Sequence, residues 1–148
     1  MTSSPPHDFA VLALGDELED RLPRDRWAVR EEKPVILGMF WRPMPDVAVV
    51  RGDLRTFSQK TPRRHDIALL VEVSDTTYPK DTGKKLRGYE RSGVSLYWVV
   101  DLNRRRVEVR EMTDKGLSLM ATYQEHEELP LRLDGQDFGR IRVEKFLP

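Results

Sequence analysis

The chain has no cysteine among its 148 residues, which excludes disulfides and thiolate metal sites. Any metal must therefore be held by oxygen or histidine ligands. The sequence also lacks a glycine-rich phosphate-binding loop and any serine or cysteine nucleophile motif. These absences exclude P-loop nucleotide hydrolysis and the common forms of covalent catalysis by serine or cysteine.

Long apolar runs and an excess of one charge are missing as well. No stretch approaches the roughly 18 apolar residues that a membrane span needs. No basic segment followed by an apolar one marks a secretory signal, so we expect a cytoplasmic protein. The 25 basic and 25 acidic residues cancel, and this balance neither indicates nor excludes nucleic acid, because a neutral protein can carry a local basic strip.

Length predicts one domain, with residues 1–7 as a flexible lead and residues 8–148 as the folded unit. Asp8 is a plausible N-cap of an amphipathic helix that Pro23 ends. The apolar positions of this helix recur at steps of three and four, at Val11, Leu14, Leu18 and Leu22.

The remaining pattern is mostly that of strands. Residues 80–92 predict a second helix, which Gly93 ends. The other apolar and β-branched runs predict extended segments at 27–39, 47–50, 67–73, 94–101, 107–111 and 117–123. Residues 51–66 are polar and basic and predict a long loop. This order indicates an α/β (α+β) fold, with few helices around a sheet.

Glu72 is the most informative single residue. It interrupts the apolar run 67–73, which predicts a strand buried on both faces. An ionised carboxylate in such a strand is costly unless it is paired or binds a metal. The alternative, an edge position where Glu72 points to water, is equally consistent with the local sequence.

Asp46 and Lys85 say less on their own. Pro45-Asp46 is a common turn dipeptide, and Lys85 fits a surface ion pair with Asp81 four residues earlier. Two carboxylates on neighbouring strands, however, can bind Mg²⁺ through their oxygens. A lysine beside them can position a water and stabilise developing negative charge on a phosphate. Together the three residues predict one divalent-metal site of the kind that cuts phosphodiester bonds.

A longer pattern supports this interpretation. Asp81, Lys85 and Tyr89 follow one another at steps of four and share a helix face. The whole pattern comprises Pro45-Asp46, Glu72-Val73, Asp81, Lys85, Tyr89, Gly93-Val94, Tyr97-Trp98 and Asp101. It resembles the Uma2 family of restriction endonucleases, of the PD-(D/E)xK nuclease superfamily. The resemblance is most specific in the run LLVEVSDTTYPKDTGKKLRGYERSGVSLYWVVDL, residues 69–102.

The resemblance implies a restriction-endonuclease-like fold, a mixed central β-sheet flanked by helices with the acids at its open edge. It implies that Asp46 and Glu72 bind the metal, with the Val73 carbonyl as a candidate third ligand. The superfamily usually places a lysine two residues after the second acid, where this chain has Ser74. The resemblance therefore assigns the catalytic lysine to Lys85. Two further residues, Asp81 and Tyr89, would support or orient that lysine.

A basic loop lies between the two acids in sequence. It contains Lys60, Arg63, Arg64 and His65, and it either follows a DNA backbone or is simply a solvated loop. The first functional hypothesis is a Mg²⁺- or Mn²⁺-dependent endodeoxyribonuclease, with DNA as partner and a homodimer for cutting both strands.

A second hypothesis stays open, a catalytically inactive binding module with the same fold. Family members usually start with a further segment that carries a glutamate and a glycine turn, which we do not find here. This departure and the neutral net charge favour the second hypothesis.

Overall fold

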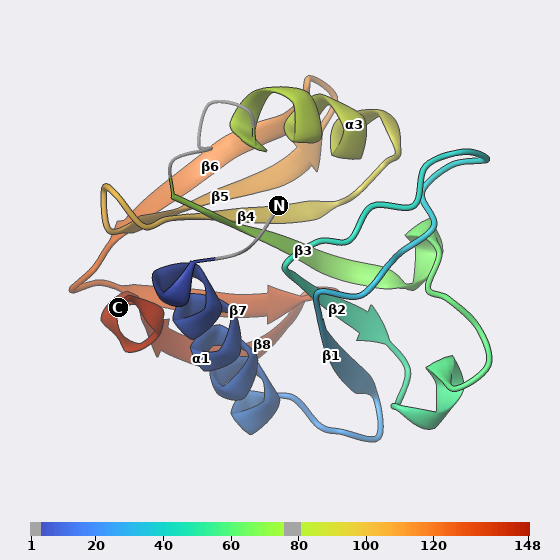
Figure 1. Cartoon of the computed structure of the whole chain (residues 1–148), viewed down its shortest axis with the longest axis horizontal. Coiled ribbons are helices and arrows are strands. Elements are labelled where there is room, and N and C mark those ends of the chain that lie inside the picture. The colour runs from blue at the N-terminus through green and yellow to red at the C-terminus, as the bar shows by residue number, and fades with distance from the viewer. Residues whose placement is uncertain (1–3, 76–80) are drawn as a thin grey trace.

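The computed structural model describes residues 4–75 and 81–148, except for the side chains of residues 81 and 82 (Figure 1). The described residues form one six-stranded sheet and one two-stranded sheet. The large sheet has the order β1-β2-β3-β4-β5-β6, and only the β3–β4 pair is parallel. Its strands are β1 (Trp27–Glu31), β2 (Val47–Arg51), β3 (Ile67–Ser74), β4 (Leu96–Asp101), β5 (Arg106–Thr113) and β6 (Gly116–Gln124). The predicted mixed sheet with few helices is confirmed.

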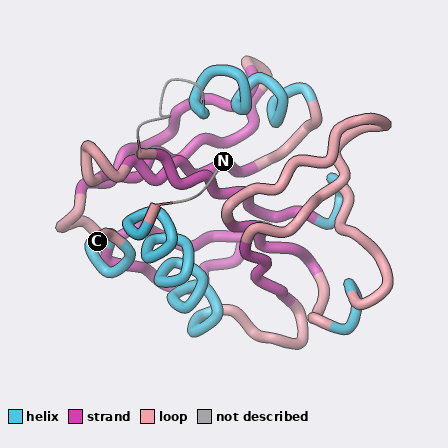
Figure 2. Tube along the Cα trace, viewed as in Figure 1, coloured by secondary structure: helices cyan, strands magenta, loops and turns pink. Residues whose placement is uncertain are grey.

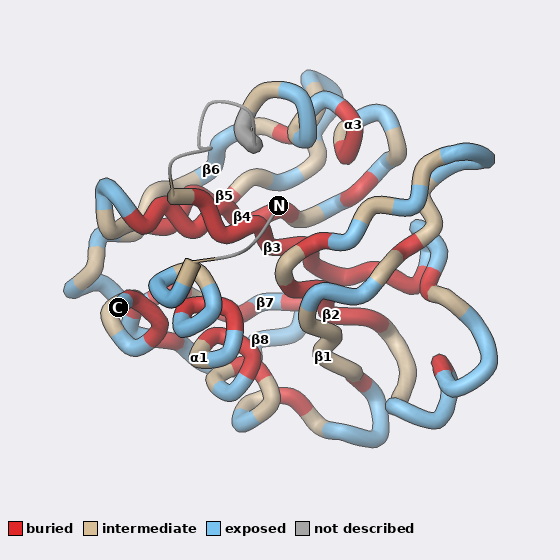
Figure 3. The backbone as a smooth tube through the Cα atoms, viewed as in Figure 1, coloured by how far each residue is buried: buried red, intermediate tan, exposed pale blue. Residues whose placement is uncertain are grey.

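Strand β3 is buried along its whole length, as the continuous apolar run predicted (Figure 3). Leu69 and Val71 point to one face and belong to the core cluster that includes residues of the N-terminal helix. Leu70 points to the other face, into a second cluster that includes Tyr89. Because side chains alternate along a strand, Glu72 shares the face of Leu70.

Helix α1 (Pro5–Arg21) packs against β1, β3 and β8 through its apolar stripe. The helix begins at Pro5, three residues before Asp8, so the prediction of Asp8 as its N-cap was wrong. Ser4 is the N-cap, and its hydroxyl accepts a hydrogen bond from the His7 N–H at 3.3 Å. The prolines at positions 5 and 6, which suggested a loose lead, are well suited to the first turn of a helix.

The second predicted helix is divided. A π-helical turn, η3 (Asp81–Lys85), runs into α3 (Leu86–Arg91), and the predicted start at Lys80 lies outside the described residues. Gly93 follows the helix with φ of 80°, which confirms its role as the residue after the C-cap. Helices α1 and α3 lie on opposite sides of β3 and β4 (Figure 2). None of the described helices is long and apolar enough to span a membrane.

The predicted extended segment 27–39 is strand only as far as Glu31. Glu32 adopts φ of 53°, a conformation in which a strand does not continue, and residues 32–46 form a projecting loop (Figure 1). This loop returns to the sheet at Asp46, directly before β2. Its two ends are therefore held by the β1–β2 pair, while its middle projects from the sheet.

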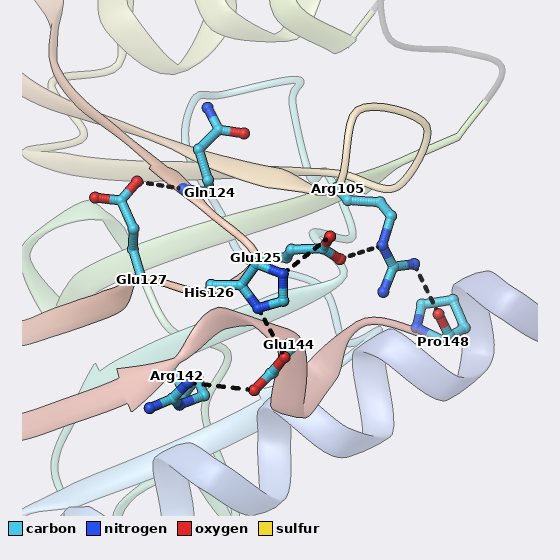
Figure 4. A network of polar contacts seen from close by, with 8 residues as sticks. All are labelled: Arg105, Gln124, Glu125, His126, Glu127, Arg142, Glu144 and Pro148. Atoms are coloured by element: carbon cyan, nitrogen blue, oxygen red, sulfur yellow. Dashed lines mark hydrogen bonds and ion pairs between the residues drawn. The ribbon is translucent and has the colours of Figure 1, made fainter.

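The C-terminal part forms β7 (Glu128–Leu133), β8 (Gln136–Arg142) and the 3₁₀ helix η4 (Val143–Phe146), which complete the core under α1. A polar network fixes this part to the large sheet (Figure 4). In it, Arg105 pairs with Glu125 and donates to the carbonyl of Pro148, and His126 lies 3.3 Å from Glu144. The eight residues of the network include none of the predicted site residues.

Candidate active site

Asp46 and Glu72 meet at the end of the β2–β3 ladder. Val47 is paired with Val71, so Asp46, one residue before, lies opposite Glu72. The Asp46 N–H donates to Glu72 Oε1 at 3.0 Å, and the Val73 N–H donates to Asp46 Oδ2 at 2.7 Å. Each carboxylate is therefore held by a backbone N–H of the neighbouring strand or strand end.

The second oxygen of Glu72 receives two side chains from the α3 region. The Tyr89 hydroxyl donates to Oε2 at 3.1 Å, and the Lys85 ammonium lies 3.0 Å from the same atom. The step of four between Lys85 and Tyr89 places both on one helix face, as the sequence predicted. The structure thus brings Asp46, Glu72, Lys85 and Tyr89 together.

The Glu72 side chain is a buried ionisable group, and only 1% of the residue's surface is exposed. Burial, and next the neighbouring Asp46 carboxylate, raise the pKa of Glu72 to about 7, although Lys85 acts in the opposite direction. Burial and the Glu72 carboxylate also raise the pKa of Tyr89, so that its hydroxyl remains a donor at any physiological pH. The alternative of a water-facing Glu72 at a sheet edge is excluded by this burial.

The other predicted supporting residues are less fully defined. Ser74 is buried at the end of β3, and its carbonyl accepts a hydrogen bond from the Leu102 N–H at 2.8 Å. The side chain of Asp81 lies outside the described part of the structure. The role of the Val73 carbonyl as a third metal ligand stays a prediction.

His7 is a site residue that the sequence did not reveal. Its Nε2 lies 3.2 Å from Asp46 Oδ1, and its Nδ1 is buried without a hydrogen-bond partner. The earlier start of α1 places this side chain in the first helical turn, over the end of β2. A histidine near the start of an amphipathic helix does not on its own predict a contact with a distant aspartate.

A match to a protein-family model identifies the family of this chain. The model of the Uma2 family, described as "Putative restriction endonuclease", matches residues 1–142. The chain belongs to the Uma2 family.

One solved structure supports the same fold for this Uma2 chain. It is the crystal structure of a protein from Anabaena variabilis described as a putative nuclease, with 10% sequence identity and a TM-score of 0.71. The match covers 99% of this chain and 82% of the other. The comparison with curated proteins finds no match.

The donor set of the Uma2 site fits a hard divalent cation. Two adjacent carboxylates, one of them fully buried, supply the oxygen ligands that Mg²⁺ and Mn²⁺ prefer. Their mutual repulsion contributes to the raised pKa of Glu72, and a cation between them would offset it. Asp46 and Glu72 are the residues that would hold such an ion.

A second group of possible ligands adjoins the first. Ligand atoms of His7, Asp8 and Glu32 lie within 4.8 Å of one another. Asp8 and Glu32 are exposed, and carboxylates in such positions are usually only solvated. This group touches Asp46 at two points, through the His7 imidazole and through the Glu32 N–H, which donates to the Asp46 carbonyl at 3.0 Å.

The predicted basic residues divide into two places. Arg63 and Arg64 line a cavity together with Arg42, which lies outside the predicted basic loop. Lys60 is not among the residues that line it, and its ammonium lies 5.4 Å from the Phe57 ring. The conformation of residues 32–46, rather than the sequence spacing, determines which basic side chains line the cavity.

Proposed function

We propose that this Uma2 chain is a Mg²⁺- or Mn²⁺-dependent endonuclease that hydrolyses DNA phosphodiester bonds. The observation that carries the proposal is the buried Glu72 carboxylate, held by the Asp46 N–H, the Tyr89 hydroxyl and the Lys85 ammonium. A carboxylate buried among strand residues is retained at a cost, and such perturbed groups concentrate at functional sites. Membership of a family described as restriction endonucleases agrees with this chemistry.

Asp46 and Glu72 would bind the metal, with the Val73 carbonyl as a third ligand. A divalent cation bound there polarises the scissile phosphate and lowers the pKa of the attacking water. The Asp46 N–H and the Tyr89 hydroxyl each hold one oxygen of Glu72, so the carboxylate is fixed before substrate arrives.

Lys85 would stabilise the negative charge that develops on the phosphate. Nearly half of its side chain, 46%, is exposed, while its ammonium lies within reach of the buried Glu72. The group can therefore contact both the carboxylate and a substrate at the surface. Asp81 and Ser74 are proposed to support this arrangement.

Two such sites can cut both strands of a duplex in one binding event, so we propose a homodimer as the form that makes double-strand breaks. Sedimentation velocity tests this part of the proposal. A dimer is the expected species, and a monomer that still makes double-strand breaks would contradict it.

The nuclease proposal is tested by plasmid nicking with Mg²⁺ or Mn²⁺. The Lys85→Ala variant is expected to lose nicking by about 100-fold or more, because it removes electrostatic stabilisation of the transition state. The neighbouring, exposed Lys84 supplies the matched control, and Lys84→Ala should nick like the unmodified chain. Equal nicking by the two variants would refute the role of Lys85.

Calorimetry separates the nuclease from a non-catalytic binding module. Titration with Mn²⁺ should show binding that Asp46→Asn and Glu72→Gln abolish. If both variants give the same binding heat as the unmodified chain, and the unmodified chain does not nick DNA, the non-catalytic binding module is favoured.

A further inference from the structure

A cavity of about 520 Å³ opens between the projecting loop and the segment before β3. Its lining residues are Ile36, Leu37, Gly38, Met39, Arg42, Arg63, Arg64 and His65. The two walls are joined by backbone contacts, since the Ile36 N–H donates to the Pro62 carbonyl at 2.8 Å and Ile36 bridges to Arg63. The cavity is therefore part of the folded structure and not a chance gap between two loops.

The charge of this cavity has one sign. Arg42, Arg63 and Arg64 are exposed, and the described residues that line the cavity with them include no aspartate or glutamate. Within the described residues, no ion pair joins any of these three guanidinium groups to a carboxylate. Three guanidinium groups that are not neutralised around one hollow are suited to bind phosphate, because guanidinium matches the geometry of phosphate oxygens.

The loop that forms one wall is fixed to the candidate active site. Trp41 packs on Tyr89 with ring centroids 5.5 Å apart, and Tyr89 donates to Glu72. The fit is close, because a Cβ at Gly88 would lie 2.5 Å from the Trp41 ring. Arg42 precedes Asp46 by only four residues, so it lies within about 14 Å of that residue. A strand bound in the cavity would thus be within a few nucleotides of the metal ligands.

The tip of the same loop presents large apolar side chains to solvent. Phe40 is 94% exposed and Met39 is 88% exposed, and the tip of the loop is coloured as exposed in Figure 3. The combination of a basic groove with an exposed aromatic is typical of surfaces that bind single-stranded nucleic acid, where bases stack on the ring.

We infer that this cavity is a binding site for single-stranded DNA. The three arginines bind the backbone phosphates, and Phe40 stacks with an unpaired base. The inference rests on the proposed nuclease function, because it specifies how substrate is held beside Asp46 and Glu72. It also specifies the preferred substrate as a single strand or a duplex that is locally open.

The test is fluorescence anisotropy with a labelled 16-nucleotide single strand in EDTA, so that cleavage plays no part. Arg42→Ala and Arg64→Ala should each weaken binding and reduce the slope of log K against log salt by about 0.7 for each phosphate that the variant no longer neutralises. Arg140→Ala, which removes an exposed arginine of β8, is the matched control and should change neither quantity.

Phe40 is tested in the same assay with a matched apolar control. Phe40→Ala should weaken binding of the single strand about tenfold, and binding of the same sequence as a closed duplex much less. Leu54→Ala removes another highly exposed apolar side chain, 83% exposed, outside the cavity and should have no effect.

Several results would overturn the inference. These are no binding of the single strand, equal effects of Arg42→Ala, Arg64→Ala and Arg140→Ala, or a Phe40→Ala variant that binds normally but loses self-association. Failure of the single-strand binding site and failure of the proposed nuclease function give different results. Arginine-dependent binding without nicking leaves the site in place, whereas nicking without arginine dependence leaves only the nuclease.

Discussion

The Nε2 atom of His7 lies 3.2 Å from Oδ1 of Asp46, while the Val73 N–H holds the other oxygen of that carboxylate at 2.7 Å. Asp46 is thus positioned from both sides, by the first turn of α1 and by the end of β3. A carboxylate held by two groups has a defined orientation before any ligand binds.

This arrangement predicts that His7 supports metal binding through Asp46. His7→Leu should weaken Mn²⁺ binding by about 10–100-fold, the usual cost of losing a residue that orients a metal ligand. His7→Gln, which keeps a polar side chain beside Asp46, should recover much of the affinity. Isothermal titration measures both, with the exposed His126→Leu as control. Similar affinities for the leucine and glutamine variants would contradict a role through the polar contact with Asp46.

Tyr89 is predicted to stabilise the fold through the ionised Glu72. Tyr89→Phe keeps the ring between Trp41 and Tyr97 but removes the donor to a buried carboxylate. We expect a loss of about 2 kcal/mol in the free energy of unfolding at pH 8, from urea denaturation. Tyr123→Phe, a partly exposed tyrosine of β6, should change stability by much less. An unchanged free energy of unfolding in Tyr89→Phe would show that the hydroxyl contributes nothing.

The raised pKa of Glu72 predicts a specific pH dependence. In the unfolded chain Glu72 loses its proton near its ordinary pKa of 4.5, whereas the folded chain keeps it until about pH 7. Between these values the folded state binds the extra proton, so the contribution of Glu72 to stability is full below pH 4.5 and is lost as pH rises to 7. The stability of the unmodified chain relative to Glu72→Gln should fall on the order of 3 kcal/mol over this window. Urea unfolding of both proteins at each pH measures it, and a constant difference would refute the shift.

A stabilising ion pair far from the site provides an independent prediction. Arg51 at the end of β2 donates two hydrogen bonds of 2.7 Å to Asp134 in the β7–β8 turn, and this contact lowers the pKa of Asp134. Asp134→Asn should cost about 1 kcal/mol at pH 7, because the pair is partly exposed and bidentate. This loss of stability should vanish as pH falls below the pKa of Asp134 in the folded chain. The Asp134→Asn variant should nick plasmid normally. Asp114→Asn, in the β5–β6 turn, is the control, and equal stability of the two variants at pH 7 would contradict the prediction.

Much of the central fold follows from local sequence. The apolar run of β3 required burial on both faces, and the step of four between Lys85 and Tyr89 required a shared helix face. Glu72 stood out because a carboxylate in such a run needs partners. The family pattern predicted Lys85 near the carboxylates and Tyr89 as a support for Lys85, whereas in the structure both side chains contact Glu72 Oε2.

What the sequence did not reveal depends on contacts between distant segments. Asp8 satisfies the chemistry of an N-cap as well as Ser4 does, so the start of α1 was misplaced and the contact of His7 with Asp46 was missed. Arg42 joins Arg63 and Arg64 only because the projecting loop folds back along the segment before β3. Such loop conformations are set by tertiary packing, here that of Trp41 on Tyr89, and not by local preference.

The most direct test of the central claim is an anomalous difference map from crystals soaked in Mn²⁺. The account predicts a peak at coordination distance from carboxylate oxygens of both Asp46 and Glu72, with the Lys85 ammonium displaced from its position beside Glu72. The same map from Glu72→Gln crystals should lack that peak. No peak between the two carboxylates of the unmodified chain, or a peak only among His7, Asp8 and Glu32, would contradict the account.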